Sequence, residues 1–130
     1  MKEDAKVWFD YAEENYSAAA LLLKSDLYNA CLQNIQQAIE KHLKSLLLEK
    51  GVKIEKTHHI QALVNQLNSL GYQLNILPED VELIDSIYLP SKYPFGSALL
   101  YFIPDKAICG RCMEIASKVR DDVQSEISNP

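Results

Sequence analysis

The chain has 130 residues, of which 48% are hydrophobic and 24% charged, and its formal net charge is −5. This length and composition fit one soluble globular domain over residues 1–130, which buries roughly two-thirds of its unfolded surface without needing disulfides or metals. Acidic residues are spread along the chain and there is no basic tail or stripe. Sequence-independent binding to RNA or DNA is therefore disfavoured.

The first residues and the cysteines indicate a cellular compartment. The segment from Met1 to Lys6 lacks the apolar core of a secretory signal, and no stretch approaches the roughly 18 apolar residues of a membrane span. Three cysteines, an odd number in a chain without an export signal, argue for reduced thiols. We therefore expect a cytoplasmic protein that does not contact a membrane.

The first predicted helix is defined by apolar or small residues that recur three or four positions apart. These residues are Ala5, Trp8, Phe9, Ala12, Tyr16, Ala19, Ala20 and Leu23. The spacing predicts a helix from Ala5 to about Lys24, with Asp4 available as its N-cap. The acidic residues between the stripe positions are expected to face outward: Asp10, Glu13 and Glu14.

The second predicted helix follows a short break at Ser25 and Asp26 and runs to Glu49, where Gly51 supplies the left-handed conformation that commonly closes a helix. So short a link predicts an antiparallel hairpin. Its apolar residues form one stripe with others off it, so we expect it to pack against two neighbours or a second subunit. The stripe is Tyr28, Leu32, Ile35, Ile39, Leu43 and Leu46, and the others are Leu27, Cys31, Ala38 and Leu47.

A third helix is predicted from His58 to about Leu70. Thr57 precedes it as a possible N-cap, and Gly71 ends it. We expect this helix to bury four apolar side chains: Ile60, Leu63, Val64 and Leu67.

Prolines divide the rest of the chain. Pro78, followed by acidic residues, is typical of a first helical turn and predicts a fourth helix to about Tyr88. Pro90 and Pro94 are expected to exclude regular helix from the aromatic-rich segment 89–103. The last helix, after Pro104, carries Ile108, Cys112, Ile115, Ala116, Val119, Val123 and Ile127 at helical spacing. Five helices with short connections predict an all-α up-and-down bundle of four to five helices.

Four short motifs, taken in order, resemble the HEPN family of small prokaryotic all-α domains. They are Ala5, Trp8, Ala12 and Ala19; Gln36-Gln37-Ala38-Ile39-Glu40-Lys41 with Leu43, Lys44, Leu46 and Leu47; Thr57-His58 with Ile60 and Leu63; and Tyr88-Leu89-Pro90-Ser91-Lys92-Tyr93-Pro94. Together they cover nearly the whole chain. The resemblance implies a HEPN-like bundle, usually a homodimer, often encoded beside a minimal nucleotidyltransferase or fused to one.

The resemblance also implies nucleotide binding or a toxin role, and many toxin members cleave RNA with an arginine followed a few residues later by a histidine. Here the only arginines are Arg111 and Arg120, and every histidine precedes them. The chain thus lacks a local pair of proton acceptor and phosphate-binding cation. In the proline-bracketed segment, Lys92 stands where relatives carry arginine, so the bidentate fork that grips phosphate is lost.

These observations favour a nucleotide-binding or regulatory partner of a minimal nucleotidyltransferase, in a toxin–antitoxin-like module, without RNase activity and without an assigned catalytic residue. Two alternatives stay open. One is an RNase toxin whose dimer cleft uses Lys92, Tyr93 or His58 from two subunits. The other is a helical adaptor that binds another protein through residues 89–103.

The candidate ligand-binding residues are Gln37, Glu40, Lys41, Lys44, His58, Tyr88, Lys92 and Tyr93. Those on the second helix line a cleft for a polar ligand, pack at a subunit interface, or form a solvated face with a Glu40–Lys44 pair worth about 0.3–0.5 kcal/mol. His58 either faces a ligand or bonds backbone groups at a helix start. Lys92 and the tyrosines either stack a base and hold a phosphate or seal the bundle.

The segment Cys109-Gly110-Arg111-Cys112 has the spacing of redox dithiols and of half a zinc site. No second cysteine pair and no βαβ context accompany it, so we expect buried cysteines on the last helix. The adjacent His58 and His59 are too few to hold a metal alone. We expect no metal and no cofactor.

Overall fold

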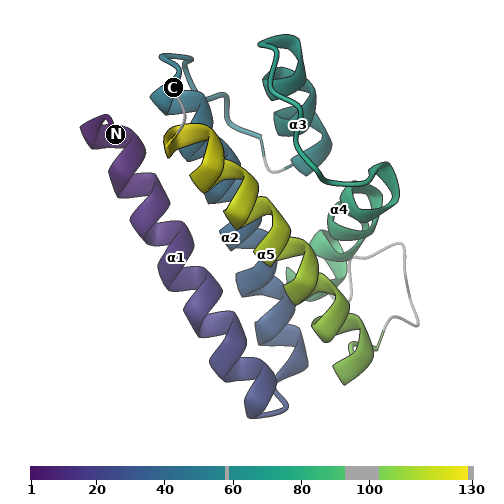
Figure 1. The fold of residues 1–130 in the computed structure, drawn as a ribbon. Coiled ribbons are helices and arrows are strands. Elements are labelled where there is room, and N and C mark those ends of the chain that lie inside the picture. The colour runs from purple at the N-terminus through teal and green to yellow at the C-terminus, as the bar shows by residue number, and fades with distance from the viewer. Residues whose placement is uncertain (58, 93–102, 129–130) are drawn as a thin grey trace.

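The computed structural model describes residues 1–57, 59–92 and 103–128, with the backbone alone for residues 88–92. The described part contains the helices α1 Glu3–Lys24, α2 Tyr28–Glu49, α3 Ile60–Ser69, α4 Pro78–Lys92 and α5 Lys106–Ser128. Figure 1 shows α1, α2 and α5 running alongside one another, with α3 and α4 on the side away from α1. The predicted all-α bundle is confirmed. Across the described ranges, no helix combines the length and apolar character needed to cross a membrane.

Helices α1 and α2 form the predicted antiparallel hairpin, and they pack more extensively than any other pair of helices. Ala5, Ala12 and Ala19 are fully buried and lie seven residues apart on one face of α1. Side chains this small let the two backbones approach closely. The turn places Asp26 at φ 60°, in the left-handed region that aspartate tolerates better than most residues, and Gly51 closes α2 at φ 77° as predicted.

The start of α1 differs from the prediction. The helix begins at Glu3, with Lys2 as its N-cap, so Asp4 lies within the first turn. Its Oδ1 atom accepts a hydrogen bond from the backbone N–H of Ala5 at 2.8 Å. The backbone N–H of Lys2 donates to Glu49 Oε1 at 2.6 Å, which ties this end to the end of α2. Asp4 therefore acts on the helix dipole rather than as a cap.

Helix α2 is the centre of the bundle. Thirteen of its 22 residues are buried, and it packs against each of the other four helices. The apolar residues on several sides of α2 are therefore explained by neighbours in the same chain. A second subunit is not needed to cover them.

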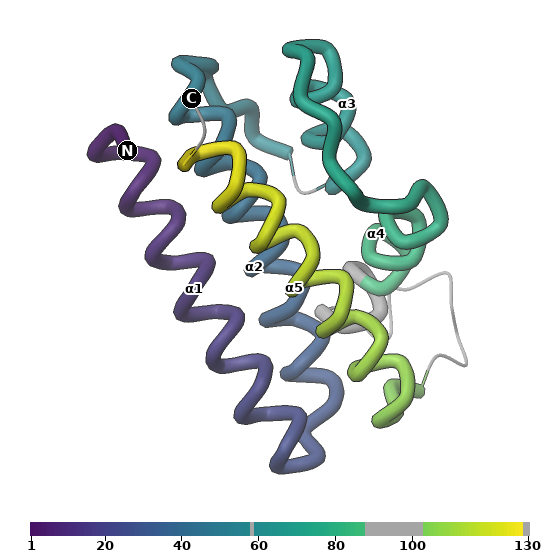
Figure 2. Tube along the Cα trace, viewed as in Figure 1, coloured from purple at the N-terminus to yellow at the C-terminus, as the bar shows by residue number. Residues whose placement is uncertain are grey.

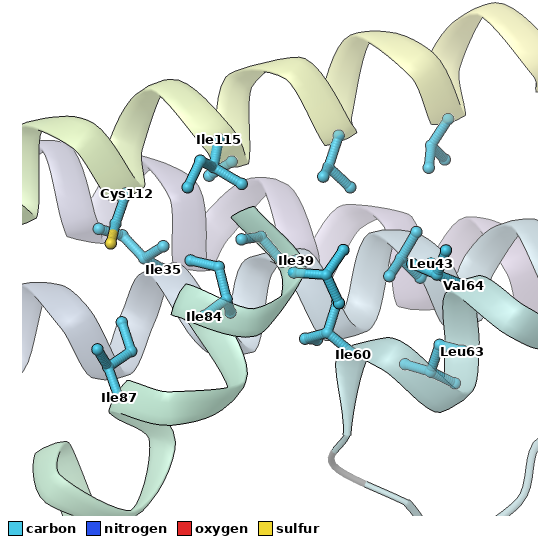
Figure 3. Close-up of a cluster of buried hydrophobic side chains, with 14 of the residues drawn as sticks. Ile35, Ile39, Leu43, Ile60, Leu63, Val64, Ile84, Ile87, Cys112 and Ile115 are labelled. Carbon is cyan, nitrogen blue, oxygen red and sulfur yellow. The ribbon is translucent and has the colours of Figure 1, made fainter. Parts of the chain in front are cut away.

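The core lies where α2 meets α3, α4 and α5. Figure 3 shows its labelled members, which are Ile35, Ile39 and Leu43 of α2, Ile60, Leu63 and Val64 of α3, Ile84 and Ile87 of α4, and Cys112 and Ile115 of α5. The four apolar residues predicted to be buried on α3 all belong to this cluster. The stripe of period 3.6 on each helix thus specifies the side that enters the core.

The start of α3 is held by a residue from another helix. The helix begins at Ile60, and Thr57 only accepts a hydrogen bond from the backbone N–H of His59, at 3.2 Å. Asp85 of α4 accepts from the backbone N–H groups of Ile60 at 2.7 Å and of Gln61 at 3.0 Å. The prediction of Thr57 as cap is therefore wrong, because a carboxylate from α4 satisfies the free N–H groups instead.

We expect Asp85→Ala to lower the free energy of unfolding by about 1–2 kcal/mol, as other lost N-caps do. The amides of α3 should then exchange with solvent faster than those of α2. Hydrogen exchange and urea unfolding measure the two effects. Glu82→Ala, at an exposed position of the same helix, is the control and should leave α3 protected. Unchanged exchange of α3 in Asp85→Ala would show that the contact has no such role.

Helix α4 starts at Pro78, as predicted, but continues to Lys92 and so passes Pro90. The prediction of an end near Tyr88 is wrong. A proline removes one N–H from the helix ladder, and with only two residues of α4 after Pro90 this loss affects its last turn alone. Pro94 and most of the predicted aromatic segment lie outside the described residues.

Candidate functional site

A row of polar side chains is buried along α2. Gln36, Glu40 and Lys44 follow one another at successive turns and are 1%, 3% and 5% exposed. Gln36 Nε2 donates to Glu40 Oε1 at 3.3 Å, and Lys44 Nζ donates to Glu40 Oε2 at 3.1 Å. We call these three residues the polar row. Their burial rules out the solvated face that was one interpretation of the sequence.

Two further groups extend the polar row. The ammonium of Lys44 lies 5.5 Å from the ring centroid of Trp8 on α1, a cation–π contact. Gln37, half-buried, donates through Nε2 to Gln36 Oε1 at 3.1 Å. Apolar residues of the same size at these positions would often stabilise the fold more than a buried ion pair does. Its presence on a central helix therefore favours a role in specificity or binding.

Lys41 faces a different place, between α1 and α2. Its Nζ atom donates to Asn15 Oδ1 at 2.8 Å, and Asn15 Nδ2 donates to Asn34 Oδ1 at 3.0 Å. These residues belong to a pocket of about 380 Å³ lined by Tyr11, Glu14, Asn15, Ala18, Asn34 and Lys41, here called the Lys41 pocket. Glu40 and Lys44, which were expected to share a cleft with Lys41, do not line this pocket. Sequence reasoning missed both asparagines, because nothing in their local pattern sets them apart.

Glu13 connects three helices. Arg120 Nε of α5 donates to Glu13 Oε1 at 2.6 Å, and His42 Nε2 of α2 lies 3.0 Å from the same oxygen. His42 is fully buried, with the ring of Phe9 edge-on at 5.1 Å between centroids. The guanidinium of Arg120 also lies 5.4 Å from the ring centroid of Tyr16. Glu13 was predicted to face outward, but this junction holds its carboxylate.

Burial sets the protonation of this junction. Desolvation lowers the pKa of His42, although the hydrogen bond to Glu13 opposes the shift. Burial would raise the pKa of Glu13, but the hydrogen bonds from Arg120 and His42 outweigh it and leave the pKa lowered. At neutral pH, His42 is therefore a neutral donor to an ionised Glu13. Its Nδ1 atom has no hydrogen-bond partner within the described part of the chain.

We expect the protein to lose stability as the pH falls below about 6.5, the ordinary histidine pKa. Below that pH, His42 takes up a proton in the unfolded chain but stays largely neutral in the folded protein. The free energy of unfolding therefore falls by at most about 1.4 kcal/mol for each pH unit. The lowered pKa of Glu13 removes further stability below its ordinary value of 4.5. Urea unfolding at pH 7.5 and 5.5 measures the first effect.

The matched test of this assignment uses two histidines. His42→Gln should reduce the difference in stability between pH 7.5 and 5.5, because the buried titrating group is gone. His59→Gln, at an exposed position, should keep that difference. The opposite pattern would place the acid sensitivity elsewhere.

The structure does not describe the side chains of the remaining predicted site residues. Tyr88 and Lys92 lie on the last turns of α4, where only the backbone is described. His58 and Tyr93 lie outside the described residues. The side chains that the structure does bring together are therefore the polar row, Gln37 and Trp8.

A second pocket, of about 570 Å³, lies between α3 and α4. It is lined by His59, Gln61, Pro78, Glu82, Asp85 and Ser86. Its carboxylates repel an anionic ligand, and Asp85 already caps α3. This pocket is poorly suited to a phosphate-bearing molecule.

The three cysteines are free and buried, which confirms the prediction for the CxxC spacing. Cys109 Sγ donates to the backbone carbonyl of Tyr28 at 3.5 Å. Burial raises the pKa of Cys109 and of Cys112 to about 12, so both remain protonated thiols at neutral pH. Among the side chains that the structure describes, no group of three His, Cys, Asp or Glu residues is arranged to hold a metal.

The fold and the site define a small all-α domain built on a long helical hairpin, with polar residues buried on its central helix. The family model of the HEPN domain matches residues 5–126. The chain therefore belongs to the HEPN domain family.

The solved structures that resemble this one include those of two other proteins. The protein TT1696 from Thermus thermophilus has a TM-score of 0.78 and 24% sequence identity, over 96% of this chain and 99% of that chain. ST0689, an archaeal HEPN homologue, has a TM-score of 0.70 and 23% identity, over 98% and 99%. At these identities the likeness shows the fold alone. Comparison with curated proteins found no match.

Proposed function

We propose that this HEPN domain is a cytoplasmic, nucleotide-binding regulatory partner of a minimal nucleotidyltransferase in a toxin–antitoxin-like module. The observation that carries the proposal is the polar row, a buried Glu40–Lys44 pair flanked by amides on the central helix. Family membership supports the class of partner. The proposed ligand-binding residues are Gln37, Glu40, Lys41 and Lys44 of α2 with His58, Tyr88, Lys92 and Tyr93.

The chemistry of these groups suits a nucleotide. Amide side chains such as Gln37 pair with the edges of bases, ammonium groups neutralise phosphate, and aromatic rings stack on bases. Helix α4 packs against α2, and Ile84 and Ile87 enter the common core. Tyr88 and Lys92 follow them on α4, and in this proposal they belong to the same site as the polar row.

The arginines support a function without RNA cleavage. Arg111 pairs with Asp80 at 3.3 Å, and Arg120 pairs with Glu13 at 2.6 Å. A scissile phosphate would have to compete with these carboxylates for the guanidinium groups. His42, which shares Glu13 with Arg120, is fully buried and cannot reach a polymer.

Calorimetric titration of the full chain with ATP and GTP tests nucleotide binding. Gln37→Leu should weaken binding at least about tenfold, the loss of one well-placed hydrogen bond to a charged or polar ligand. Gln124→Leu, at an exposed position on α5, is the matched control and should bind as the wild type does. Equal nucleotide affinities of the two variants would show that the binding site does not lie on α2.

Affinity purification of the tagged protein from its own cells tests the partner. Recovery of a small nucleotidyltransferase at fixed stoichiometry supports the proposal. If neither nucleotide nor nucleotidyltransferase binds, the proposal is wrong. Cleavage of cellular RNA by the purified protein, abolished by Lys92→Ala, would favour the RNase alternative. Loss of another protein partner in Tyr93→Ala would favour the adaptor.

A further inference from the structure

The Lys41 pocket lies between α1 and α2, which run side by side in Figure 2. No residue of the polar row lines it. Its volume of about 380 Å³ is at the small end of the roughly 300–1,000 Å³ that small-molecule sites occupy. The pocket therefore has room for a ligand of modest size, separate from the polar row.

Lys41 brings a positive charge to this pocket. Its half-buried ammonium donates to the neutral amide oxygen of Asn15 at 2.8 Å and lies 5.9 Å from the ring centroid of Tyr11. No carboxylate in the described part of the chain forms an ion pair with it. An ammonium has three N–H donors, so two remain for a ligand. Lys41 thus offers a place for an anionic group.

A chain of hydrogen bonds holds the two amides of the pocket in one orientation. Asn15 Nδ2 donates to Asn34 Oδ1 at 3.0 Å, and Asn34 Nδ2 donates to the backbone carbonyl of Ala30 at 3.0 Å. Each amide nitrogen carries two N–H donors and uses one of them in this chain. The other N–H of each amide is available to the same anionic group.

Glu14 of α1 adds a negative charge to the pocket lining. Its neighbouring carboxylates on α1 have partners: Asp10 pairs with Lys6 at 2.7 Å, and Glu13 pairs with Arg120 at 2.6 Å. Glu14 is exposed and forms no ion pair within the described ranges, not even with the ammonium of the pocket. One pocket therefore contains a cation and an anion that do not neutralise each other by contact.

We propose that the Lys41 pocket binds a free α-amino acid with an uncharged side chain. The ligand's carboxylate bonds Lys41 and the available amide N–H groups, and its ammonium pairs with Glu14. The rest of the lining is neutral, so a charged side chain finds no partner there. This inference goes beyond the proposed function. It gives Lys41 a ligand of its own and leaves the polar row and Gln37 for the nucleotide.

The two charges together select this class of ligand. Glu14 repels a phosphate group and Lys41 repels a simple amine, whereas a zwitterion satisfies both side chains. Solvent screens the exposed Glu14 more than the half-buried Lys41. We therefore expect the contact with Lys41 to contribute more to the affinity than the contact with Glu14.

Calorimetric titration of the full chain with L-glutamine is the first test, because the uncharged side-chain amide of this ligand can bond the two asparagines. The matched ligands are 4-aminobutanamide, which lacks the carboxylate, and glutaramic acid, which lacks the ammonium. We expect the first to bind at least about tenfold more weakly than L-glutamine and the second about two- to fivefold more weakly. Glutaramic acid that binds as tightly as L-glutamine overturns the proposal. So does an absence of binding by L-glutamine, L-serine and L-leucine at millimolar concentration.

Two variants test the residues. Lys41→Met should weaken L-glutamine binding at least about tenfold, and Glu14→Gln should weaken it about two- to fivefold. The matched controls Lys118→Met and Glu114→Gln, at exposed positions of α5, should bind as the wild type does.

Glu14→Gln keeps the test decisive if Lys41→Met fails to fold, because position 14 is exposed. In this variant L-glutamine and glutaramic acid should bind equally, since the ligand's ammonium has lost its partner. A preference for L-glutamine that survives Glu14→Gln overturns the assignment of Glu14.

Nuclear magnetic resonance locates the site. The side-chain N–H signals of Asn15 and Asn34 should shift when L-glutamine is added, and those of Asn75, which bonds Asp122, should not. ATP should leave the affinity for L-glutamine unchanged, because its proposed site is the polar row. Displacement of L-glutamine by ATP, or shifts only outside the pocket, overturns the inference. L-Glutamine binding in a protein that binds no nucleotide would refute the proposed function alone.

Discussion

Lys44→Met should lower the free energy of unfolding by about 3–5 kcal/mol, because it removes one partner of a buried ion pair. The Glu40 carboxylate, only 3% exposed, then loses the ammonium that lies 3.1 Å away. Methionine fills a similar volume, so the loss reports charge rather than a cavity. Urea unfolding measures it, and Lys118→Met at an exposed position of α5 should change stability by less than about 0.5 kcal/mol.

The double variant Glu40→Leu with Lys44→Met separates structure from function. Apolar residues often replace a buried ion pair at no cost, so this variant should recover to within about 1 kcal/mol of the wild type or exceed it. The double-mutant cycle then gives the coupling between the two side chains. A double variant that is stable yet binds no nucleotide would show that the polar row serves binding. Equal stability of Lys44→Met and Lys118→Met would show that the pair contributes nothing to the fold.

Local signals in the sequence predicted most of the fold. The apolar stripes predicted four of the five helices and the buried side of each, since a period of 3.6 residues follows from helix geometry alone. Gly51 and Gly71 end or follow helices at φ 77° and φ 92°, where only residues without a Cβ are unstrained. Pro78 begins α4. Each of these features depends on neighbours within a few positions.

Several of the errors concern polar residues whose partners come from other helices. Nothing in the local sequence marks Glu13 or Asp85 as bonded, and each bonds a group on a different helix. Burial of a polar side chain depends on which donor or acceptor the folded bundle brings to it. A single sequence without the tertiary arrangement does not contain that information.

The arginine and histidine residues show the same limit. In the sequence no arginine is followed closely by a histidine. The sequence also gives no sign that Arg120 and His42 share the Glu13 carboxylate. The structure brings them together, with the arginine paired to Glu13 and the histidine fully buried. Proximity in the fold is therefore not enough to assign a catalytic pair.

Ile39→Ala should lower the free energy of unfolding by about 2–5 kcal/mol, the usual range when a large buried aliphatic side chain is truncated. Ile39 is fully buried in the middle of the cluster where α2 meets the other helices, as Figure 3 shows. Ile39→Val should cost about 0.5–1.5 kcal/mol, because it leaves a smaller cavity. Leu70→Ala, at an exposed position, is the control for truncation without a cavity.

The helices that Ile39→Ala destabilises show whether α2 is the centre of the whole bundle. Because all four other helices pack on α2, Ile39→Ala should raise hydrogen exchange throughout the bundle, and circular dichroism and fluorescence should report one transition. Asp85→Ala, in contrast, should open α3 alone. If Ile39→Ala frees only α3 and α4 while α1, α2 and α5 keep their protection, the bundle consists of two units. The polar row would then belong to the stable unit, and a ligand that also contacts α4 would stabilise the two units against separation.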